Sequence, residues 1–215
     1  MRVIISGASS GIGRAIAVRF LDAGFEVFGL DIKPAPFTRP AYTHFICDLK
    51  ENVLPDIPDA EIVVSCAGTL EEADAIEVNL KGAIRFAERF TKSPVLKSML
   101  FIASASARNG AEFPYYVASK AGLVGYMKNM ALSLAKRGVT CNSISPGGVI
   151  TDSNRHILES PELYTAVKNE TLLGKWAEPD EIAELAYFLT AVNRSITGED
   201  ILVDNGEMLK SNFIW

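Results

Sequence analysis

The stretch that decides the fold reads Ser6-Gly7-Ala8-Ser9-Ser10-Gly11-Ile12-Gly13. An apolar run from Val3 to Ser6 precedes it, and a segment with helical periodicity, Gly13 to Ala23, follows it. A strand, a glycine-rich turn and a helix in this order direct backbone N–H groups and the positive end of the helix dipole toward an anion. Glycines also end strands for structural reasons alone, but their position here predicts a dinucleotide-binding turn. The residues expected to hold the pyrophosphate are Gly7, Ser9, Ser10, Gly11, Ile12 and Gly13.

Short apolar runs alternate with helix-period segments along the rest of the chain, a pattern typical of a parallel sheet covered by helices on both faces. Long helices are expected over Ala75 to Thr91 and Tyr116 to Lys136, and their apolar stripes fit either the core or a subunit interface. We therefore expect an α/β fold, a Rossmann-like doubly wound parallel sheet of about seven strands in a single domain. The expected strands are Val3–Ser6, Glu26–Leu30, Thr43–Cys47, Ile62–Ser65, Ser98–Ala103, Val139–Ser145 and Ile201–Val203.

Composition narrows the classes of partner. The 215 residues are 48% hydrophobic, enough for one sizeable core, and the formal net charge of -5 disfavours nucleic acid as a partner. The chain starts directly with a strand and has no apolar run of about 18 residues, so we expect a cytoplasmic protein without a membrane partner. The three cysteines and two histidines lack the spacing of a metal site, which predicts reduced thiols and no metal.

A single acidic residue indicates which nicotinamide cofactor the turn favours. Asp31 follows the second expected strand, 18 residues after Gly13, where its carboxylate can accept hydrogen bonds from the adenosine ribose. A solvated loop aspartate is the structural alternative. The carboxylate would repel a 2′-phosphate, and the glycine turn has no Lys or Arg to offset it, although Lys33 is close in sequence. We therefore expect NAD(H) to be preferred over NADP(H).

Two side chains in the segment Tyr116-Val117-Ala118-Ser119-Lys120 suit proton transfer. Positions i and i+4 project from one face of a helix, so the tyrosine and the lysine can meet there. A phenol with an ordinary pKa near 10 is a poor base at neutral pH, and an adjacent ammonium stabilises its phenolate. The spacing is common by chance, so the assignment depends on the surrounding residues.

Ser104 supplies part of that context. It lies just past an expected strand, at the edge of the sheet where ligands of doubly wound folds collect, and its hydroxyl can donate to a substrate carbonyl. Ser106 and Tyr115 are the rival candidates for the serine and tyrosine roles. Asn79 is a candidate to bond a water or a backbone carbonyl and so link Lys120 to solvent, the alternative being an ordinary helix asparagine.

With these residues in place, the chain resembles the compact single-domain branch of the short-chain dehydrogenase/reductase family over nearly its full length. The glycine turn is similar to the family's TGxxxGIG, Tyr116 and Lys120 are similar to its YxxxK, and residues 142–151 are similar to its strand-six signature. The resemblance implies the strand order 3-2-1-4-5-6-7. It also implies shortened helices after strands 3 and 4, over Asp48 to Glu61, which contains two prolines, and over Gly68 to Asn79.

The resemblance further implies roles for individual residues. The catalytic tetrad would be Asn79, Ser104, Tyr116 and Lys120, with Tyr116 as the acid/base and Lys120 also holding the nicotinamide ribose. Ser104 precedes Tyr116 by 12 residues, one fewer than relatives lead us to expect. Further cofactor contacts are implied for Asp48, Leu49, Cys66, Ala67, Gly68, Pro146, Gly147, Val149 and Thr151. Cys66 stands where the family carries an asparagine.

These observations favour a reversible hydride transfer between NAD(H) and a secondary alcohol or its ketone. A dinucleotide-binding sensor or scaffold with a relic active site is the alternative from a different class. An epimerase or dehydratase with tightly held NAD would resemble a longer branch of the family with its own substrate domain, for which 215 residues leave little room.

The substrate and the assembly are less readable. Residues 152–176 carry apolar side chains at near-helical spacing, which predicts a mobile lid of one or two helices over an apolar or mixed substrate. Arg155 and His156 are weaker candidates for selecting an anionic group. The end of the chain, Ser211 to Trp215, carries three large apolar residues. Together with the helical stripes, it predicts a homodimer or homotetramer.

Overall fold

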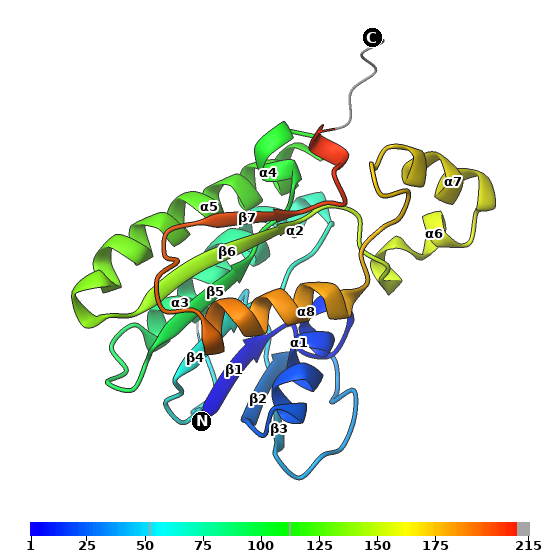
Figure 1. The fold of residues 1–215 in the computed structure, drawn as a ribbon. Coiled ribbons are helices and arrows are strands. Elements are labelled where there is room, and N and C mark those ends of the chain that lie inside the picture. The colour runs from blue at the N-terminus through cyan, green and yellow to red at the C-terminus, as the bar shows by residue number, and fades with distance from the viewer. Residues whose placement is uncertain (52, 112, 210–215) are drawn as a thin grey trace.

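The computed structural model describes residues 1–51, 53–111 and 113–209. Seven strands form one sheet in the order β3-β2-β1-β4-β5-β6-β7, with helices on both of its faces (Figure 1). All neighbouring strands are parallel. The predicted doubly wound α/β fold is therefore confirmed, together with the strand order that the family resemblance implied. The carboxyl ends of the parallel strands meet at one edge of this sheet, where a ligand is expected.

Each predicted strand is present, and its ends differ from the prediction by at most one residue. For β1, β2, β4 and β5, runs of β-branched, aromatic and other apolar residues explain this agreement, because parallel strands buried on both faces favour continuous apolar side chains. The strands are β1 (Arg2–Ser6), β2 (Glu26–Asp31), β3 (Tyr42–Ile46), β4 (Ile62–Ser65), β5 (Ser98–Ile102), β6 (Thr140–Pro146) and β7 (Asp200–Val203).

The helices agree in place, with shifted ends. The first is α1 (Gly11–Asp22), which begins two residues before the prediction. The helix predicted from Ala75 begins earlier, as α2 (Glu72–Ala75), and continues through a π-helical stretch, η1 (Ile76–Gly82), into α3 (Ala83–Phe90). Glu72 and Asp74 in its first turn suit the positive end of the helix, which explains the earlier start. The others are α4 (Ser106–Asn109), α5 (Pro114–Leu134), α6 (Arg155–Leu158), α7 (Pro161–Asn169), α8 (Pro179–Tyr187) with the π-helical η4 (Phe188–Val192), and the short 3-10 turns η2 (Ala135–Arg137), η3 (Asp152–Asn154) and η5 (Glu207–Leu209).

Two apolar clusters lie on opposite faces of the sheet. Alternate residues of β1 enter different clusters: Val3 and Ile5 pack with α1 and α8, whereas Ile4 packs with α3 and α5. The apolar stripes of the two long helices belong to the second cluster, which buries Phe86, Phe90, Leu123, Met127 and Leu134. These stripes therefore serve the core, and the rest of the oligomer prediction depends on residues 211–215, which lie outside the described residues.

The connection between β3 and β4 contains no helix among its described residues, as predicted for a segment of this length with two prolines. In place of a helix, Leu49, Ile57 and Ala60 insert their side chains into the cluster beneath α3. The predicted lid region, residues 152–176, contains the two short helices α6 and α7, which stand away from the sheet (Figure 1).

Candidate active site

The glycine-rich turn between β1 and α1 has the backbone geometry that its sequence predicts. Gly7 and Gly11 have positive φ angles of 74° and 49°. A Cβ atom on Gly13 would lie only 2.0 Å from the carbonyl oxygen of Gly7, so the first turn of α1 can pack this closely only because residue 13 is glycine. The described residues therefore fit a pyrophosphate at the amino end of α1.

The turn packs directly on the chain that leaves β4. The hydroxyl of Ser6 accepts the N–H groups of Cys66 and Ala67 at 3.1 and 3.2 Å. A Cβ atom on Gly7 would lie 2.7 Å from the nitrogen of Ala67. Ser6 thus joins the ends of two neighbouring strands, and it does so through the backbone of residues 66 and 67. The loss of amide side chains at this position leaves that backbone link intact.

Cys66 itself has a protonated, unreactive thiol at neutral pH. Burial raises its pKa to about 12, against the opposing effect of the Lys120 charge. Burial likewise raises the pKa of the Cys141 thiol to about 12, and that of Cys47 is raised as well. All three cysteines are free, as predicted.

Asp31, at the end of β2, is bonded to the glycine turn and to its own loop. Its carboxylate accepts the N–H of Ser9 at 3.0 Å and the N–H of Lys33 at 2.9 Å. The hydroxyl of Ser9 lies 2.9 Å from the carbonyl oxygen of Pro34. The carboxylate thus lies where β1, β2 and the following loop meet, as expected for a group that contacts the adenosine ribose.

Side chains of the edge strand β3 contact the loop that follows Asp31. The Tyr42 hydroxyl lies 2.8 Å from Nδ1 of His44, and Nε2 of His44 lies 2.9 Å from the carbonyl oxygen of Lys33. Burial, and then the nearby charge of Asp31, raise the pKa of Tyr42 to about 12, so this phenol stays protonated at neutral pH. A Cβ atom on Gly29 would collide with this ring, so the glycine in β2 makes room for it.

Beside Asp31, a cavity of about 520 Å³ opens at the ends of β2 and β3. Its lining includes Ile32, Ile46, Asp48 and Val53, and the three apolar side chains are more than half exposed. Two carboxylates, Asp48 and Glu51, also line the pocket, and its exposed apolar side chains fit a flat heteroaromatic ring such as adenine. Leu49, by contrast, is buried in the core, which leaves only its backbone for a ligand.

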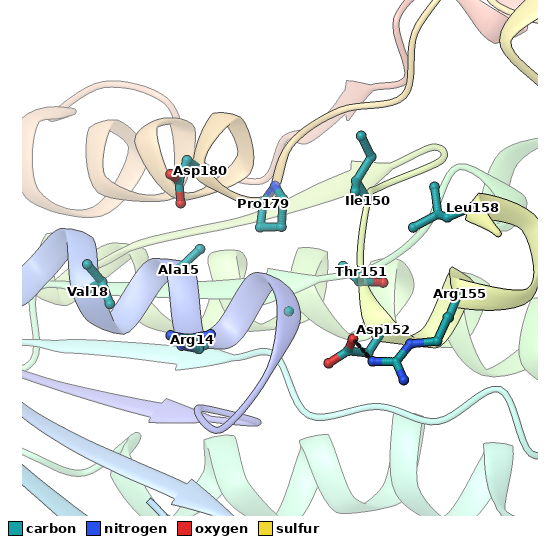
Figure 2. Close-up of a pocket in the computed structure, with 11 residues that line it drawn as sticks. Arg14, Ala15, Val18, Ile150, Thr151, Asp152, Arg155, Leu158, Pro179 and Asp180 are labelled. Carbon is teal, nitrogen blue, oxygen red and sulfur yellow. Dashed lines mark hydrogen bonds and ion pairs between the residues drawn. The ribbon is translucent and has the colours of Figure 1, made fainter. Parts of the chain in front are cut away.

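A second cavity, of about 430 Å³, lies on the outer side of the glycine turn (Figure 2). Side chains from α1, the amino end of α8, the segment after β6 and α6 line it. It shares Gly11 and Thr151 with the expected cofactor site. Arg155 faces Asp152 here at 2.7 Å, so its guanidinium is already paired within the lid region.

The helix α5 brings Tyr116 and Lys120 together. The Lys120 ammonium lies 5.8 Å from the centre of the Tyr116 ring and donates to the carbonyl oxygen of Ile102 at 2.9 Å. Lys120 is buried, with 5% of its surface exposed, and the backbone bond holds it at the end of β5. The rival Tyr115 lies largely in solvent, with 59% of its surface exposed.

Asn79 lies against the same lysine. A Cβ atom on Gly68 would lie 3.2 Å from Oδ1 of Asn79 and 3.4 Å from Nζ of Lys120, so the three residues meet at one point. The Asn79 amide accepts the N–H of Thr69 at 2.7 Å and donates to the Thr69 carbonyl at 2.9 Å. It also donates to the Ser119 hydroxyl at 3.2 Å, which in turn donates to the Tyr116 carbonyl at 2.7 Å.

Ser104 follows β5 and is nearly buried. Its hydroxyl oxygen accepts from the hydroxyl of Ser106 at 2.8 Å and from the Ser106 N–H at 3.2 Å. The two candidates for the serine role are therefore hydrogen-bonded to each other, with Ser104 as the acceptor and its own proton left to donate. The next N–H, that of Ala105, bonds the carbonyl of Pro146 at 2.8 Å and so joins this loop to the end of β6.

The segment after β6 brings the remaining expected residues to the same edge. Gly147 packs on Asp204, because a Cβ atom on it would lie 2.9 Å from the Asp204 side chain. Val149 pairs with Ala177 in an isolated parallel bridge. Thr151 then passes the glycine turn, with its methyl group 3.2 Å from the position of a Cβ atom on Gly11.

The lid region is fixed to the sheet at its far end. The carbonyl oxygen of Asn205, just past β7, accepts the N–H groups of Leu172 and Leu173 at 3.0 and 3.1 Å. Asn205 has a φ of 54°, a left-handed conformation that asparagine tolerates better than most residues. The bonds of Ile150 and Ala177 across the bridge close the base of the lid.

Two features of the site escaped sequence reasoning. The Glu72 carboxylate accepts the N–H groups of Tyr115 and Tyr116 at 3.1 and 3.0 Å. Arg108, in α4 just after Ser104, pairs with Asp200 of β7 at 2.8 Å. Only a weak indication of the Glu72 contact was present in the sequence, namely an acidic residue in a shortened connection. The Arg108 pair spans 92 residues and carried none.

The doubly wound fold and the glycine-rich turn are those of a Rossmann-like protein, the class that binds dinucleotides, and Tyr116, Lys120 and Asn79 lie together in it. A family model described as enoyl-(acyl carrier protein) reductase matches residues 68–207. The chain belongs to the short-chain dehydrogenase/reductase family, and it is an oxidoreductase like its relatives.

Individual relatives agree over almost the whole chain. A short chain dehydrogenase of Penicillium brasilianum is 29% identical over 246 residues, covering 94% of this chain and 95% of the relative. D-threitol dehydrogenase of Mycolicibacterium smegmatis is 29% identical over 241 residues, covering 96% and 92%. Ligand-free aldohexose dehydrogenase of Thermoplasma acidophilum has a TM-score of 0.87 at 27% identity, covering 100% of this chain and 96% of that one. 4-Hydroxyisoleucine dehydrogenase complexed with NADH has a TM-score of 0.86 at 27% identity, covering 98% and 99%.

Proposed function

We propose that the chain interconverts a secondary alcohol and its ketone with NAD(H), using Tyr116 as the proton-transfer group. The observation that carries the proposal is the meeting of Gly68, Asn79 and Lys120 at one point beside Tyr116. A buried lysine is costly unless it is bonded, and here its ammonium is held by a carbonyl next to a phenol. A relic site would have no need to maintain this arrangement.

The proposed chemistry divides between the cofactor and the protein. NAD(H) supplies the hydride when it is bound. In the reducing direction, the Tyr116 hydroxyl donates a proton to the substrate oxygen while the Ser104 hydroxyl donates a hydrogen bond to the same oxygen. Lys120 favours the phenolate that forms on Tyr116, because opposite charges attract strongly in a buried site. Asn79 binds the backbone of Thr69 and so keeps the neighbouring Gly68 in place against the Lys120 ammonium.

The preference for NAD(H) follows from Asp31. Its carboxylate lies at the meeting of the glycine turn and the loop after β2, where the ribose hydroxyls of NAD can donate to it and a 2′-phosphate is repelled. A 4-hydroxyisoleucine dehydrogenase of the same fold was solved with NADH, whereas L-rhamnose 1-dehydrogenase (NADP(+)) of Thermoplasma acidophilum is also among the relatives. The family therefore includes members named for either cofactor.

For the substrate we propose a small alcohol or ketone with an apolar or mixed body. Leu163, Leu172 and Leu173 of the lid region are at least half exposed, and they provide apolar surface at the edge where the strands end. Three relatives are named as dehydrogenases of a sugar acid, a sugar and a sugar alcohol. A panel of substrates therefore has to include both polyols and less polar alcohols.

The test is a panel of alcohols and ketones assayed with NAD(H) and NADP(H), comparing wild type with Tyr116→Phe and Tyr115→Phe. We expect Tyr116→Phe to lose at least about 100-fold in kcat while still binding NADH, since a positioned proton donor contributes at least that factor. Tyr115→Phe, which removes an exposed hydroxyl one residue away, should behave as wild type. Equal turnover by wild type and Tyr116→Phe rejects the proposed role. NADH binding without turnover of any substrate favours the sensor.

A further inference from the structure

The short connection between β4 and α2 is held on Asn79. The Asn79 side chain bonds both the N–H and the carbonyl of Thr69, and the Thr69 hydroxyl accepts the N–H of Glu71 at 3.0 Å. The chain from Gly68 to Glu72 is therefore a tight turn with little freedom. It ends where α2 begins, directly beside the amino end of α5 (Figure 1).

At that point α2 supplies what the start of α5 lacks. The first N–H groups of a helix have no partner within the helix, and a polar side chain at the preceding residue usually accepts one of them. In α5 the preceding residue is Phe113, which has no such group, and the first helical residue is Pro114. Both oxygens of the Glu72 carboxylate fill the gap: Oε2 accepts the N–H of Tyr115 at 3.1 Å, and Oε1 accepts that of Tyr116 at 3.0 Å.

We propose that Glu72 is a positioning residue for Tyr116: its carboxylate, carried by a neighbouring helix, closes the first turn of α5 and ties the Asn79 segment to the backbone of the proton-transfer group. This inference rests on the proposed role of Tyr116. The tyrosine is then held at its N–H by Glu72, at its carbonyl by Ser119, and beside its ring by Lys120. Ser119 is itself bonded to Asn79, and Asn79 also fixes Thr69 in the turn that leads to Glu72. Both hydrogen bonds to the Tyr116 backbone are therefore connected to Asn79.

The charge of Glu72 gives the link a measurable signature. Asp74 of the same helix is paired with Lys50 at 3.3 Å, and the buried cation near the tyrosine is Lys120. Removing the Glu72 charge leaves the positive end of α5 and Lys120 to act on the phenolate without an opposing carboxylate. Alcohol oxidation needs the phenolate, so its rise with pH should then start at lower pH. A merely structural contact would not move this part of the pH profile.

The experiment compares Glu72→Gln with Glu71→Gln in the whole protein. Glu71 is exposed and adjacent, and its substitution removes the same charge without touching α5. For Glu72→Gln we expect kcat to fall about 10-fold with NADH affinity within twofold, since misplacement of a reacting group costs rate rather than binding. The acid limb of the pH profile of kcat should move down by about 0.5 pH unit, which is the effect expected from the loss of one partly screened charge near the phenol. Glu71→Gln should match wild type in all three.

Two further measurements make each outcome decisive. Glu72→Asp keeps the charge on a shorter side chain, so kcat should fall while the acid limb stays in place. If Glu72→Gln matches Glu71→Gln in rate and pH profile, the inference is overturned. The inference is also overturned if NADH affinity and melting temperature fall together with kcat while the acid limb of the pH profile stays in place. Glu72 then only stabilises the fold. Tyr116→Phe separates the two hypotheses: full activity in that variant defeats the proposed function whatever Glu72→Gln shows.

Discussion

The carboxylate of Asp31 accepts the backbone N–H of Ser9 at 3.0 Å, which joins the end of β2 to the glycine-rich turn after β1. The same carboxylate accepts the N–H of Lys33, so one side chain links the glycine-rich turn to the loop after β2. A substitution of Asp31 therefore tests the proposed cofactor preference directly.

Asp31→Asn should shift the ratio of kcat/KM for NAD+ over NADP+ by at least about 10-fold toward NADP+. The amide keeps the shape and one acceptor for Ser9, whereas the repulsion of a 2′-phosphate by a carboxylate is worth about 1–2 kcal/mol near a surface. Steady-state kinetics with both cofactors measure the ratio. Glu26→Gln removes the same charge at the exposed opposite end of β2 and should leave the ratio unchanged. An unchanged ratio in Asp31→Asn would show that selectivity lies elsewhere.

Gly13→Ala should abolish NADH binding and destabilise the fold by about 3 kcal/mol or more. Its new Cβ atom meets the Gly7 carbonyl oxygen at 2.0 Å, and neither backbone can move without opening the turn. Gly125→Ala in the interior of α5 is the contrasting variant, because nothing lies within 4 Å of the added atom. It should raise stability by about 0.5–1 kcal/mol. Urea unfolding and fluorescence titration with NADH give both numbers, and normal NADH binding by Gly13→Ala contradicts the prediction.

Asp200→Asn should cost about 2 kcal/mol of stability. One oxygen of the nearly buried Asp200 carboxylate accepts both the Ser143 and the Ser145 hydroxyls at 2.7 Å, and the other accepts Nε of Arg108 at 2.8 Å. An amide has a single acceptor oxygen, and its NH2 group faces either a guanidinium or two donors. Thermal unfolding of this variant is compared with Glu199→Gln, an exposed neighbour that should change little. Equal melting temperatures for the two variants would contradict it.

Glu61→Gln should lower stability at pH 7 by about 0.5 kcal/mol, and the difference should shrink in acid. Burial favours the neutral form of Glu61, but the backbone hydrogen bonds it accepts, from the Arg2 N–H at 2.8 Å and from its own N–H, together with the charges of the N-terminus and Lys97, outweigh burial, and the pKa is lowered. A carboxyl whose folded pKa is depressed contributes stability above its unfolded pKa of about 4.3, and loses it as the pH falls through the folded value. Urea unfolding at pH 7 and below pH 4.5 checks the trend. A gap that widens in acid reverses the sign and defeats the prediction.

NADH should bind with a dissociation constant no tighter than about 1 μM. The connection after β3 has no covering helix among its described residues, and Ile32, Ile46 and Val53 remain more than half exposed around the cavity at the ends of β2 and β3. Less apolar area is then removed from water on binding. Calorimetric titration measures the constant directly. A value well below a micromolar would mean that the shortened connection does not weaken the site.

The strands were predictable where a short apolar run is buried on both faces of the sheet. Runs such as Ile62–Ser65 leave little freedom, and their ends fall within one residue of the pattern. The end of a helix is set by weaker effects, which explains why α2 begins at Glu72 rather than at Ala75. The π-helical turn around Asn79 left no mark in the periodicity, because a single widened turn shifts the apolar stripe only slightly.

The site was predictable where one motif carries several residues. Tyr116 and Lys120 are four positions apart on one helix, so their meeting follows from helix geometry alone. Contacts between distant segments do not follow from local pattern. The bond of Lys120 to Ile102, the Glu72 carboxylate on α5, and the burial of Leu49 all depend on how helices settle on the sheet. These contacts follow from the three-dimensional packing and not from the local sequence pattern.

The bonds from Leu172 and Leu173 to the Asn205 carbonyl have a consequence for motion. They join the end of the lid region to the end of β7, and the bridge between Val149 and Ala177 closes the other side. Any swing of α6 and α7 therefore leaves residues 172–177 in place and takes its pivots from the chain just before residue 172 and just after Ile150. Asn205 is thus the residue that anchors the end of the lid region to the sheet. A substitution by a residue that disfavours the left-handed backbone conformation at position 205 would weaken both of these hydrogen bonds together.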